Sequence, residues 1–256
     1  VVEGGGRVRK QMAYSSVNAA GVPGTVAGLI HALENYGSLD LKTVIQPAID
    51  LAEQGFEVPA ALHLNLRSAA QRLAKNDEAN RVYLAGTATA PLMGSLFKQP
   101  DLAATLKRIR ERGRDGFYKG KTAELVVAEM QRQGGLMTQA DLASYQAIER
   151  TPVRSSFRGY ELVSAPPPSS GGVHVSQILK LLEPFPLKEL GHNSAAYLHL
   201  LIESMKLAYA DRSEYLGDPD RTAVPVAKLI SDDFLDQRRT PVRGAVATPP
   251  SEIRPG

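Results

Sequence analysis

The first part of the sequence has the apolar spacing of helices. Apolar residues recur at steps of three and four, which places them on one face of a helix. Glycine, the residue that most readily ends a helix, follows several of these stretches. The pattern predicts helices over residues 25–36, 41–54, 62–73, 100–112 and 123–133. A shorter helix is predicted from Thr138 to Tyr145, because Thr138 and Asp141 form part of a capping box.

Two of these helices have well-defined apolar faces. Their members are Val26, Leu29, Ile30 and Leu33 in the first helix, and Leu41, Val44, Ile45, Ala48 and Ala52 in the second. Pro47 lies inside the second helix and lacks the N–H that an interior position donates. We therefore expect a kink or a restart at this proline.

The pattern changes at Thr151. Alternating residues at 153–157 and 160–164 flank Arg158 and Gly159, which predicts two short strands joined by a tight turn. After a run of prolines, the apolar residues 173–182 and a long stretch from Ser194 to Leu216 predict two further helices. Many helices with few strands predict an α+β protein whose sheet is only partly supplied by this segment.

The composition of the chain reduces the number of possible function classes. The 256 residues are 43% hydrophobic, enough for one large or two small domains. No apolar run approaches the roughly 18 residues that would span a bilayer. The net charge of +3 is too small to hold a polyanion, and without interleaved aromatic residues we expect no nucleic-acid binding. We interpret the densest basic stretch as a solvated helix end, because cations there face the negative end of the helix dipole. It comprises Lys107, Arg108, Arg110, Arg112 and Arg114.

Both ends of the sequence have unusual features. It begins at Val1 without a methionine or the regions of a signal peptide, so we expect that an upstream segment has been removed. Residues 246–256 contain prolines and no apolar period, which is typical of a linker or a processing site. The absence of cysteine excludes disulfides and thiolate chemistry.

Serines and glycines after the proline run are the first candidate site. Ser169 and Ser170 lie near His174, but the nucleophile elbow of serine hydrolases requires a different sequence on a strand-to-helix turn. A structural turn and helix cap is therefore favoured over a catalytic serine. Alternatively, Ser170, Gly171 and Gly172 present backbone donors at a helix N-terminus, where a carboxylate can bind. The five histidines have no paired spacing, so no metal site is predicted.

Charged residues on the longest predicted helix are the second candidate site. Glu203 and Lys206 lie three residues apart, so we expect them to face each other across its surface. Asp211 and Arg212 follow near the helix end, and Asp218 before a proline is typical of a turn. We interpret this set as an internal network of ion pairs and turns, in preference to catalytic groups.

The order of the motifs along the chain is more informative about the protein family than any single motif. In register along nearly the whole chain, they resemble the large subunit of γ-glutamyltranspeptidase. The most specific segment runs from Arg158 through Pro166, Pro167 and Pro168 to the glycines of the turn. The matching segments are residues 24–28, 46–48, 116–120, 134–136, 150–152, 158–160, 166–172 and 217–219, with Glu203, Lys206, Asp211 and Arg212 in the same order.

This resemblance implies an N-terminal nucleophile hydrolase with a four-layer αββα fold, to which the chain supplies mainly helices and a few strands. Such a precursor cuts itself before a threonine, and the large and small subunits stay associated. The threonine starts the small subunit and acts as nucleophile, with its own α-amine as base. It attacks glutathione or another γ-glutamyl compound, and the acyl group passes to water, an amino acid or a peptide. No cofactor is implied, and the location is periplasmic or secreted.

Departures from the family pattern limit the catalytic role that the resemblance implies for this chain. The threonine-bearing segment and the upstream arginine that clamps the substrate are absent, and the surroundings of Arg114 do not match that arginine. Residues 1–256 are thus interpreted as a single large-subunit segment with no catalytic residue. At most, Ser169, Ser170, Gly171 and Gly172 line or buttress the substrate cleft. A glutaryl or cephalosporin acylase of the same architecture, or a non-catalytic binding module, stays open.

Overall fold

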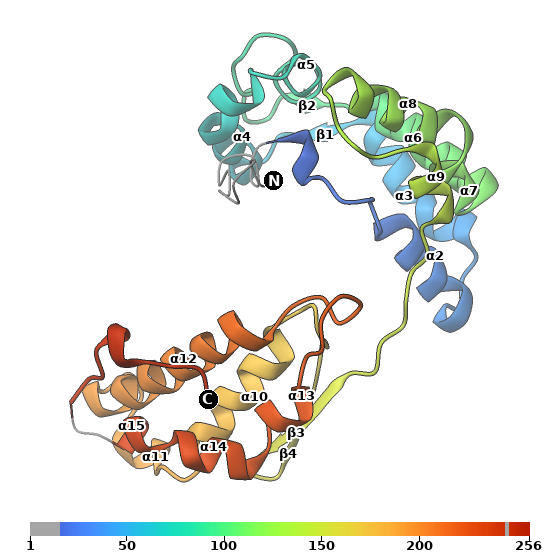
Figure 1. Cartoon of the computed structure of the whole chain (residues 1–256). Helices are drawn as coiled ribbons and strands as arrows, with labels where there is room; N and C mark the ends of the chain where they lie inside the picture. The colour runs from blue at the N-terminus through green and yellow to red at the C-terminus, as the bar shows by residue number, and fades with distance from the viewer. Residues whose placement is uncertain (1–15, 244–245) are drawn as a thin grey trace. The chain divides into compact units, whose positions relative to one another are not determined.

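The computed structural model describes residues 16–243 and 246–256, and these form two compact units (Figure 1). The first unit is Val1–Ile148 and the second is Glu149–Gly256. The division falls close to Thr151, where the sequence pattern changes. Val1, where the sequence begins, lies outside the described residues.

The first unit is built mainly of helices around a small core. Its helical elements are η1 (Val17–Ala19), α2 (Thr25–Tyr36), α3 (Leu41–Gln54), α4 (Ala60–Leu73), α5 (Asp77–Leu84), α6 (Pro100–Arg112), α7 (Asp115–Tyr118), α8 (Gly120–Arg132) and α9 (Gln139–Ser144). Strands β1 (Phe56–Glu57) and β2 (Leu96–Phe97) pair antiparallel. The core comprises Ala27, Tyr118, Ala123, Val127, Met130, Met137 and Leu142.

All six helices predicted in this unit are present: α2, α3 and α6 have the predicted bounds, and those of α4, α8 and α9 differ by one to three residues. The capping box at α9 is complete, because Thr138 Oγ1 accepts from Asp141 N and Thr138 N donates to Asp141 Oδ2. The restart expected at Pro47 is wrong, since α3 continues through this residue. Tertiary packing of α3 on α6 outweighs the backbone hydrogen bond that the proline removes.

The apolar faces of α2 and α3 are only partly buried. Ile30 on α2 and Ile49 on α3 are buried, whereas Leu29 is 67% exposed and Val44 is 43% exposed. The predicted faces line a groove of about 560 Å³ between α2, α3 and α6. The helical period therefore located the apolar faces correctly, and part of each face lines this groove.

The basic stretch around α6 is not simply a solvated helix end. Lys107 Nζ pairs with Glu53 at 2.5 Å, and Arg110 Nη1 donates to Gln46 Oε1 at 2.7 Å. Both partners lie on α3, while Arg108 donates to a threonine of α8. The cations thus tie α6 to its neighbouring helices.

The second unit combines one hairpin with a group of helices. Its elements are β3 (Val153–Phe157), β4 (Tyr160–Ser164), α10 (Gly171–Leu182), α11 (Leu187–Leu190), α12 (Ala195–Tyr215), α13 (Val226–Leu229), α14 (Asp232–Arg238), α15 (Thr240–Arg243) and η2 (Pro250–Glu252). The hairpin is confirmed: Arg158 and Gly159 both have positive φ, at 48° and 84°, as a two-residue type I′ turn requires.

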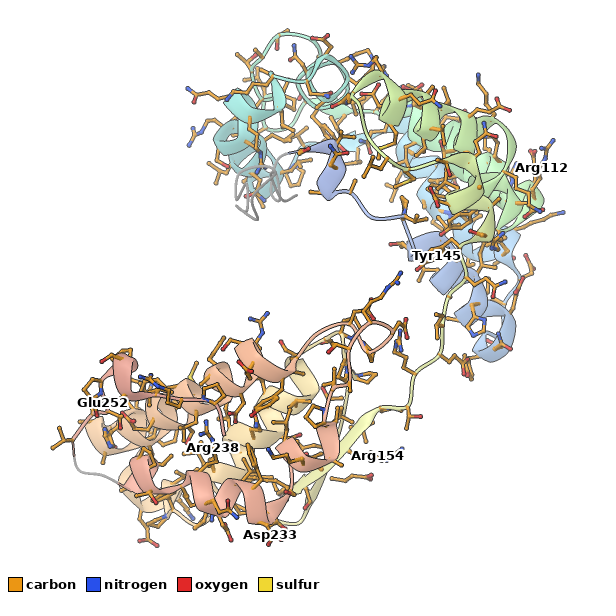
Figure 2. All side chains as sticks on the ribbon, viewed as in Figure 1. Arg112, Tyr145, Arg154, Asp233, Arg238 and Glu252 are labelled. Atoms are coloured by element: carbon orange, nitrogen blue, oxygen red, sulfur yellow. The ribbon has the colours of Figure 1, made fainter. Side chains whose placement is uncertain are left out.

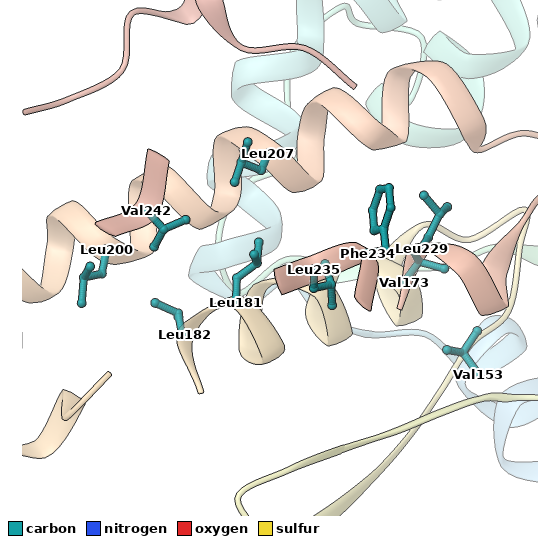
Figure 3. Packing of buried hydrophobic residues seen from close by; sticks show 10 residues of the cluster. All are labelled: Val153, Val173, Leu181, Leu182, Leu200, Leu207, Leu229, Phe234, Leu235 and Val242. Carbon is teal, nitrogen blue, oxygen red and sulfur yellow. The ribbon is translucent and has the colours of Figure 1, made fainter. Parts of the chain in front are cut away.

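The core of the second unit lies between α10, α12 and α14. Figure 3 shows leucines of α10 and α12 gathered with Phe234 and Leu235 of α14. Leu181, Leu229 and Leu235 are almost completely buried. This packing brings together three helices that supply the polar and charged groups of the candidate site.

Candidate functional site

The turn after β4 is a well-defined structure. Ser169 N donates to Pro166 O at 3.1 Å, and the peptide bond between Pro167 and Pro168 is cis. Gly171 N then donates to Ser169 Oγ at 3.3 Å. The proline run therefore reverses the chain, and the serine begins to satisfy the free donors at the start of α10.

Gly172 allows α10 to approach the hairpin closely. A Cβ on this residue would lie 2.5 Å from the carbonyl oxygen of Ala165 and 3.1 Å from Cβ of Val153. Ser176, one turn later, donates to Gly172 O at 2.7 Å and shares a hydrogen bond with Ser155 of β3. The glycine therefore has a packing role in this turn.

Gly172→Ala is expected to destabilise the second unit by about 1–3 kcal/mol, the usual cost of inserting a methyl group into a packed site. The backbone oxygen of Ala165 cannot move away without disturbing the end of β4. Gly171→Ala is the matched control, because its Cβ would meet only Ser169 Oγ, at 3.5 Å. Urea unfolding of both variants measures the difference, and equal stabilities would show that the packing argument is wrong.

The serine and histidine at this turn have different partners. Ser170 Oγ accepts from Arg212 Nε at 3.3 Å, and a guanidinium cannot take up the hydroxyl proton as a general base would. His174 is 8% exposed and its ring lies 4.9 Å from that of Tyr209. Burial lowers the pKa of His174, which favours the neutral ring, and its Nε2 has no hydrogen-bond partner among the described atoms. These contacts favour the structural interpretation of the two residues.

Glu203 and Lys206 on α12 form the predicted ion pair, but inside the protein. Their Oε1 and Nζ atoms are 2.6 Å apart, and Glu203 is fully buried. Both also contact Thr248: Glu203 Oε1 accepts from its N at 3.2 Å, and Lys206 Nζ donates to its O at 2.6 Å. Burial by itself raises the pKa of Glu203, but the bonds from Lys206 and Thr248 outweigh it and lower the pKa overall. The carboxylate therefore stays charged.

Asp211 is paired with a residue that sequence analysis missed. Its Oδ1 lies 2.9 Å from Nη2 of Arg238 on α14 and also accepts from Gly256 N at 2.9 Å. Gln177 of α10 donates to Oδ2 at 3.0 Å. Burial raises the pKa of Asp211 in spite of these bonds. Figure 2 shows the labelled Arg238 within the second unit. The adjacent Arg212 instead bonds to the proline-run turn, as described above.

Asp218 has the turn geometry that its sequence predicts. Its Oδ1 accepts from Asp220 N at 3.0 Å, and its carbonyl accepts from the amides of Arg221 and Thr222 at 2.9 Å. Asp220 also pairs with Arg150 at 2.6 Å. Asp218 therefore organises the loop that follows α12.

Arg238, Gln177 and Thr248 are the residues of this network that sequence analysis did not find. A signal for α14 was present, because Ser231 followed by Asp232 and Asp233 is typical of a helix start. No local signal indicated Gln177 or Thr248, whose partners lie far away in the sequence. The network as a whole connects α10, α12, α14 and residues 248–256, and it positions chain segments.

Known structures share this architecture. The structure matches the crystal structure of Helicobacter pylori γ-glutamyltranspeptidase with a TM-score of 0.96 and 40% sequence identity, covering 100% of this chain and 73% of that one. This sequence identity and this coverage establish the class of protein to which the chain belongs. The chain is an α+β part of an N-terminal nucleophile hydrolase, mostly helical with few antiparallel strands.

Sequence comparison identifies the family. The family model described as Gamma-glutamyltranspeptidase matches residues 4–255, and the chain belongs to that family. It is 44% identical over 238 residues to the glutathione hydrolase proenzyme of Escherichia coli strain K12, covering 93% of this chain and 41% of the relative. It is also 43% identical over 222 residues to the acylase ACY 1 proenzyme of Pseudomonas sp. strain SE83, covering 86% and 39%. The chain thus spans less than half the length of these relatives.

The helices within residues 16–243 and 246–256 all lack the combination of length and apolar character that a bilayer span requires.

Proposed function

We propose that this chain is part of the large subunit of a γ-glutamyltransferase and glutathione hydrolase. The observation that carries the proposal is the family match, which extends from residue 4 to residue 255. In this proposal, residues 1–256 are one segment of that subunit. The complete enzyme cleaves γ-glutamyl amides such as glutathione and transfers the acyl group to water, an amino acid or a peptide.

The nucleophile belongs to a partner subunit. A threonine at the start of that subunit attacks the γ-glutamyl carbonyl, and its own α-amine accepts the hydroxyl proton. The contacts of Ser170 and His174 support this division, since each is engaged in structural packing. The role of Ser169, Ser170, Gly171 and Gly172 is then to line or buttress the cleft.

Assembly and location complete the proposal. The similarity to proteins named proenzymes supports a precursor that cuts itself into two subunits, which stay together as a heterodimer. A periplasmic or secreted location follows the bacterial family resemblance.

A glutaryl or cephalosporin acylase is the second candidate. The similarity to an acylase proenzyme, at 43% identity, favours it over a non-catalytic binding module. The two enzymes differ in the acyl group that they accept, because a γ-glutamyl group carries an α-ammonium that a glutaryl group lacks.

We expect the isolated chain to show no turnover of a chromogenic γ-glutamyl anilide, and the full precursor, which includes both the upstream segment and the continuation, to show turnover. The physical reason is that only the continuation supplies an activated hydroxyl. Release of the coloured aniline from this substrate is measured for both proteins, and its release from a glutaryl anilide is measured in parallel. A continuation in which alanine replaces the first threonine is the matched control.

Two results would contradict the proposal. Turnover by the isolated chain would place the nucleophile in residues 1–256. Turnover of glutaryl anilide alone by the full precursor would instead identify an acylase.

A further inference from the structure

Residues 248–256, which we call the strap, are held against the second unit by charged side chains. At one end, Glu203 and Lys206 bind both backbone groups of Thr248. At the other end, Asp211 Oδ1 accepts from Gly256 N, and Arg238 Nη2 donates to Arg254 O at 2.8 Å. The sequence predicted a linker or a processing site here, and the structure shows a segment bound at two separate points.

All of these contacts are made to the strap's backbone. Such contacts hold the path of a segment whatever its side chains are, so the register must be set by another feature. Gly256 adds a close approach: a Cβ there would lie 2.5 Å from Cδ of Arg238 and 2.7 Å from Cζ of Phe234. Tyr215 also donates its hydroxyl to Gly256 O. A chain displaced by one residue would lose the glycine at this point and bring a side chain against both neighbours.

The groups that bind the strap are buried charges. The Glu203 and Asp211 side chains are 1% and 2% exposed, and those of Lys206 and Arg238 are 19% and 13% exposed. Removing such charges from water is costly, so buried pairs often add little stability over apolar residues. Their best-attested role is to specify one arrangement over its alternatives. Glu203, Lys206 and Asp211 also share the long helix α12, a rigid support for both binding points.

We propose that Glu203, Lys206, Asp211 and Arg238 are positioning residues for self-cleavage of the precursor. They hold the strap on one path, with Gly256 setting its register, so that the chain beyond Gly256 reaches the cleavage site in a fixed geometry. This inference rests on the proposed function, in which the precursor continues towards the threonine. The net step is hydrolysis: the peptide bond before the threonine breaks, and one water supplies the hydroxyl of the new carboxyl group and the hydrogen of the new amine. Small misplacements slow such intramolecular reactions strongly.

The test uses the full precursor with Glu203→Leu and Lys206→Met combined. Removing both charges together avoids a stranded buried ion, so the unfolding midpoint should stay near that of the unmodified precursor. We expect faster hydrogen exchange at the amide of Thr248 and self-cleavage slowed by about tenfold or more. Lys206→Arg keeps a donor for both Glu203 and Thr248 O, and should cleave at a rate close to the original. Cleavage is followed by gel electrophoresis over time.

Arg154→Gln with Glu161→Gln is the matched control. This pair also lies in the second unit, but its side chains are 61% and 65% exposed, so cleavage should be unchanged. The inference is overturned if the variant with Glu203→Leu and Lys206→Met cleaves at the rate of the unmodified precursor, or if its Thr248 amide stays protected from hydrogen exchange. It is also overturned if the Lys206→Arg variant cleaves as slowly as that double variant. An unmodified precursor that does not cleave would contradict the proposed function itself.

Discussion

Asp211→Ala is expected to lower the free energy of unfolding of the second unit by about 3–5 kcal/mol, the cost of breaking a buried ion pair from one side. The substitution leaves the guanidinium of Arg238, whose side chain is 13% exposed, without its carboxylate. It also removes one acceptor of Gln177 Nε2 and the acceptor of Gly256 N. Urea unfolding followed by circular dichroism measures the change.

This loss of unfolding free energy is not the interaction energy between Asp211 and Arg238. Burial raises the pKa of Asp211, which means that the folded protein disfavours its charge. Most of the expected loss therefore comes from leaving Arg238 without its carboxylate and Gly256 N without its acceptor, whereas Gln177 Nε2 keeps its bond to Leu229 O. Asp220→Ala is the matched control: its pair with Arg150 involves a side chain that is 53% exposed, so a change of at most about 1 kcal/mol is expected. Equal effects of the two substitutions would refute the role given to burial.

Tyr118→Ala is expected to destabilise the first unit by about 3–5 kcal/mol, as for other large buried aromatic residues. Tyr118 is fully buried and stacks on Tyr145, with ring centroids 5.7 Å apart. Its hydroxyl donates to Pro23 O at 2.6 Å and accepts from Ala27 N at 3.2 Å. Ala27 lies in the first turn of α2, so the tyrosine also satisfies a donor that the helix itself leaves free.

Tyr118→Phe separates the two contributions. It keeps the ring and removes only the hydroxyl, so a loss of about 1–3 kcal/mol is expected, the cost of leaving buried partners unsatisfied. Both variants are compared by thermal and urea unfolding of the same chain. If the phenylalanine variant were as unstable as the alanine variant, the packing of the ring would contribute little.

Elements that depend on neighbouring residues could be predicted from the sequence. The spacing of apolar residues and the glycines that follow them defined the long helices, because a helix is stabilised by contacts three and four residues apart. Arg158 and Gly159 defined the hairpin in the same way. The short helices α7 and α13 were missed, since four residues are too few to show a period. Strands β1 and β2 have two residues each and pair across intervening helices, which no local pattern reveals.

In the candidate site, too, contacts between residues close in the sequence were predicted and contacts between distant residues were not. The spacing of Glu203 and Lys206 predicted their pairing, because residues three apart on a helix are neighbours. Their burial was not predicted, since it depends on Thr248, which lies 45 residues from Glu203 in the sequence. The exposure of Leu29 was not predicted either, because a helical period identifies an apolar face but not what covers it.

The sequence by itself determined the local elements, the family resemblance and the absence of thiol chemistry. Only the tertiary structure decided that Asp211 pairs with Arg238 while its neighbour Arg212 contacts Ser170. It also decided that residues 248–256 are bound to α12 and α14. The physical reason is that successive side chains on a helix point in different directions, so their partners come from whichever distant segments pack on each side.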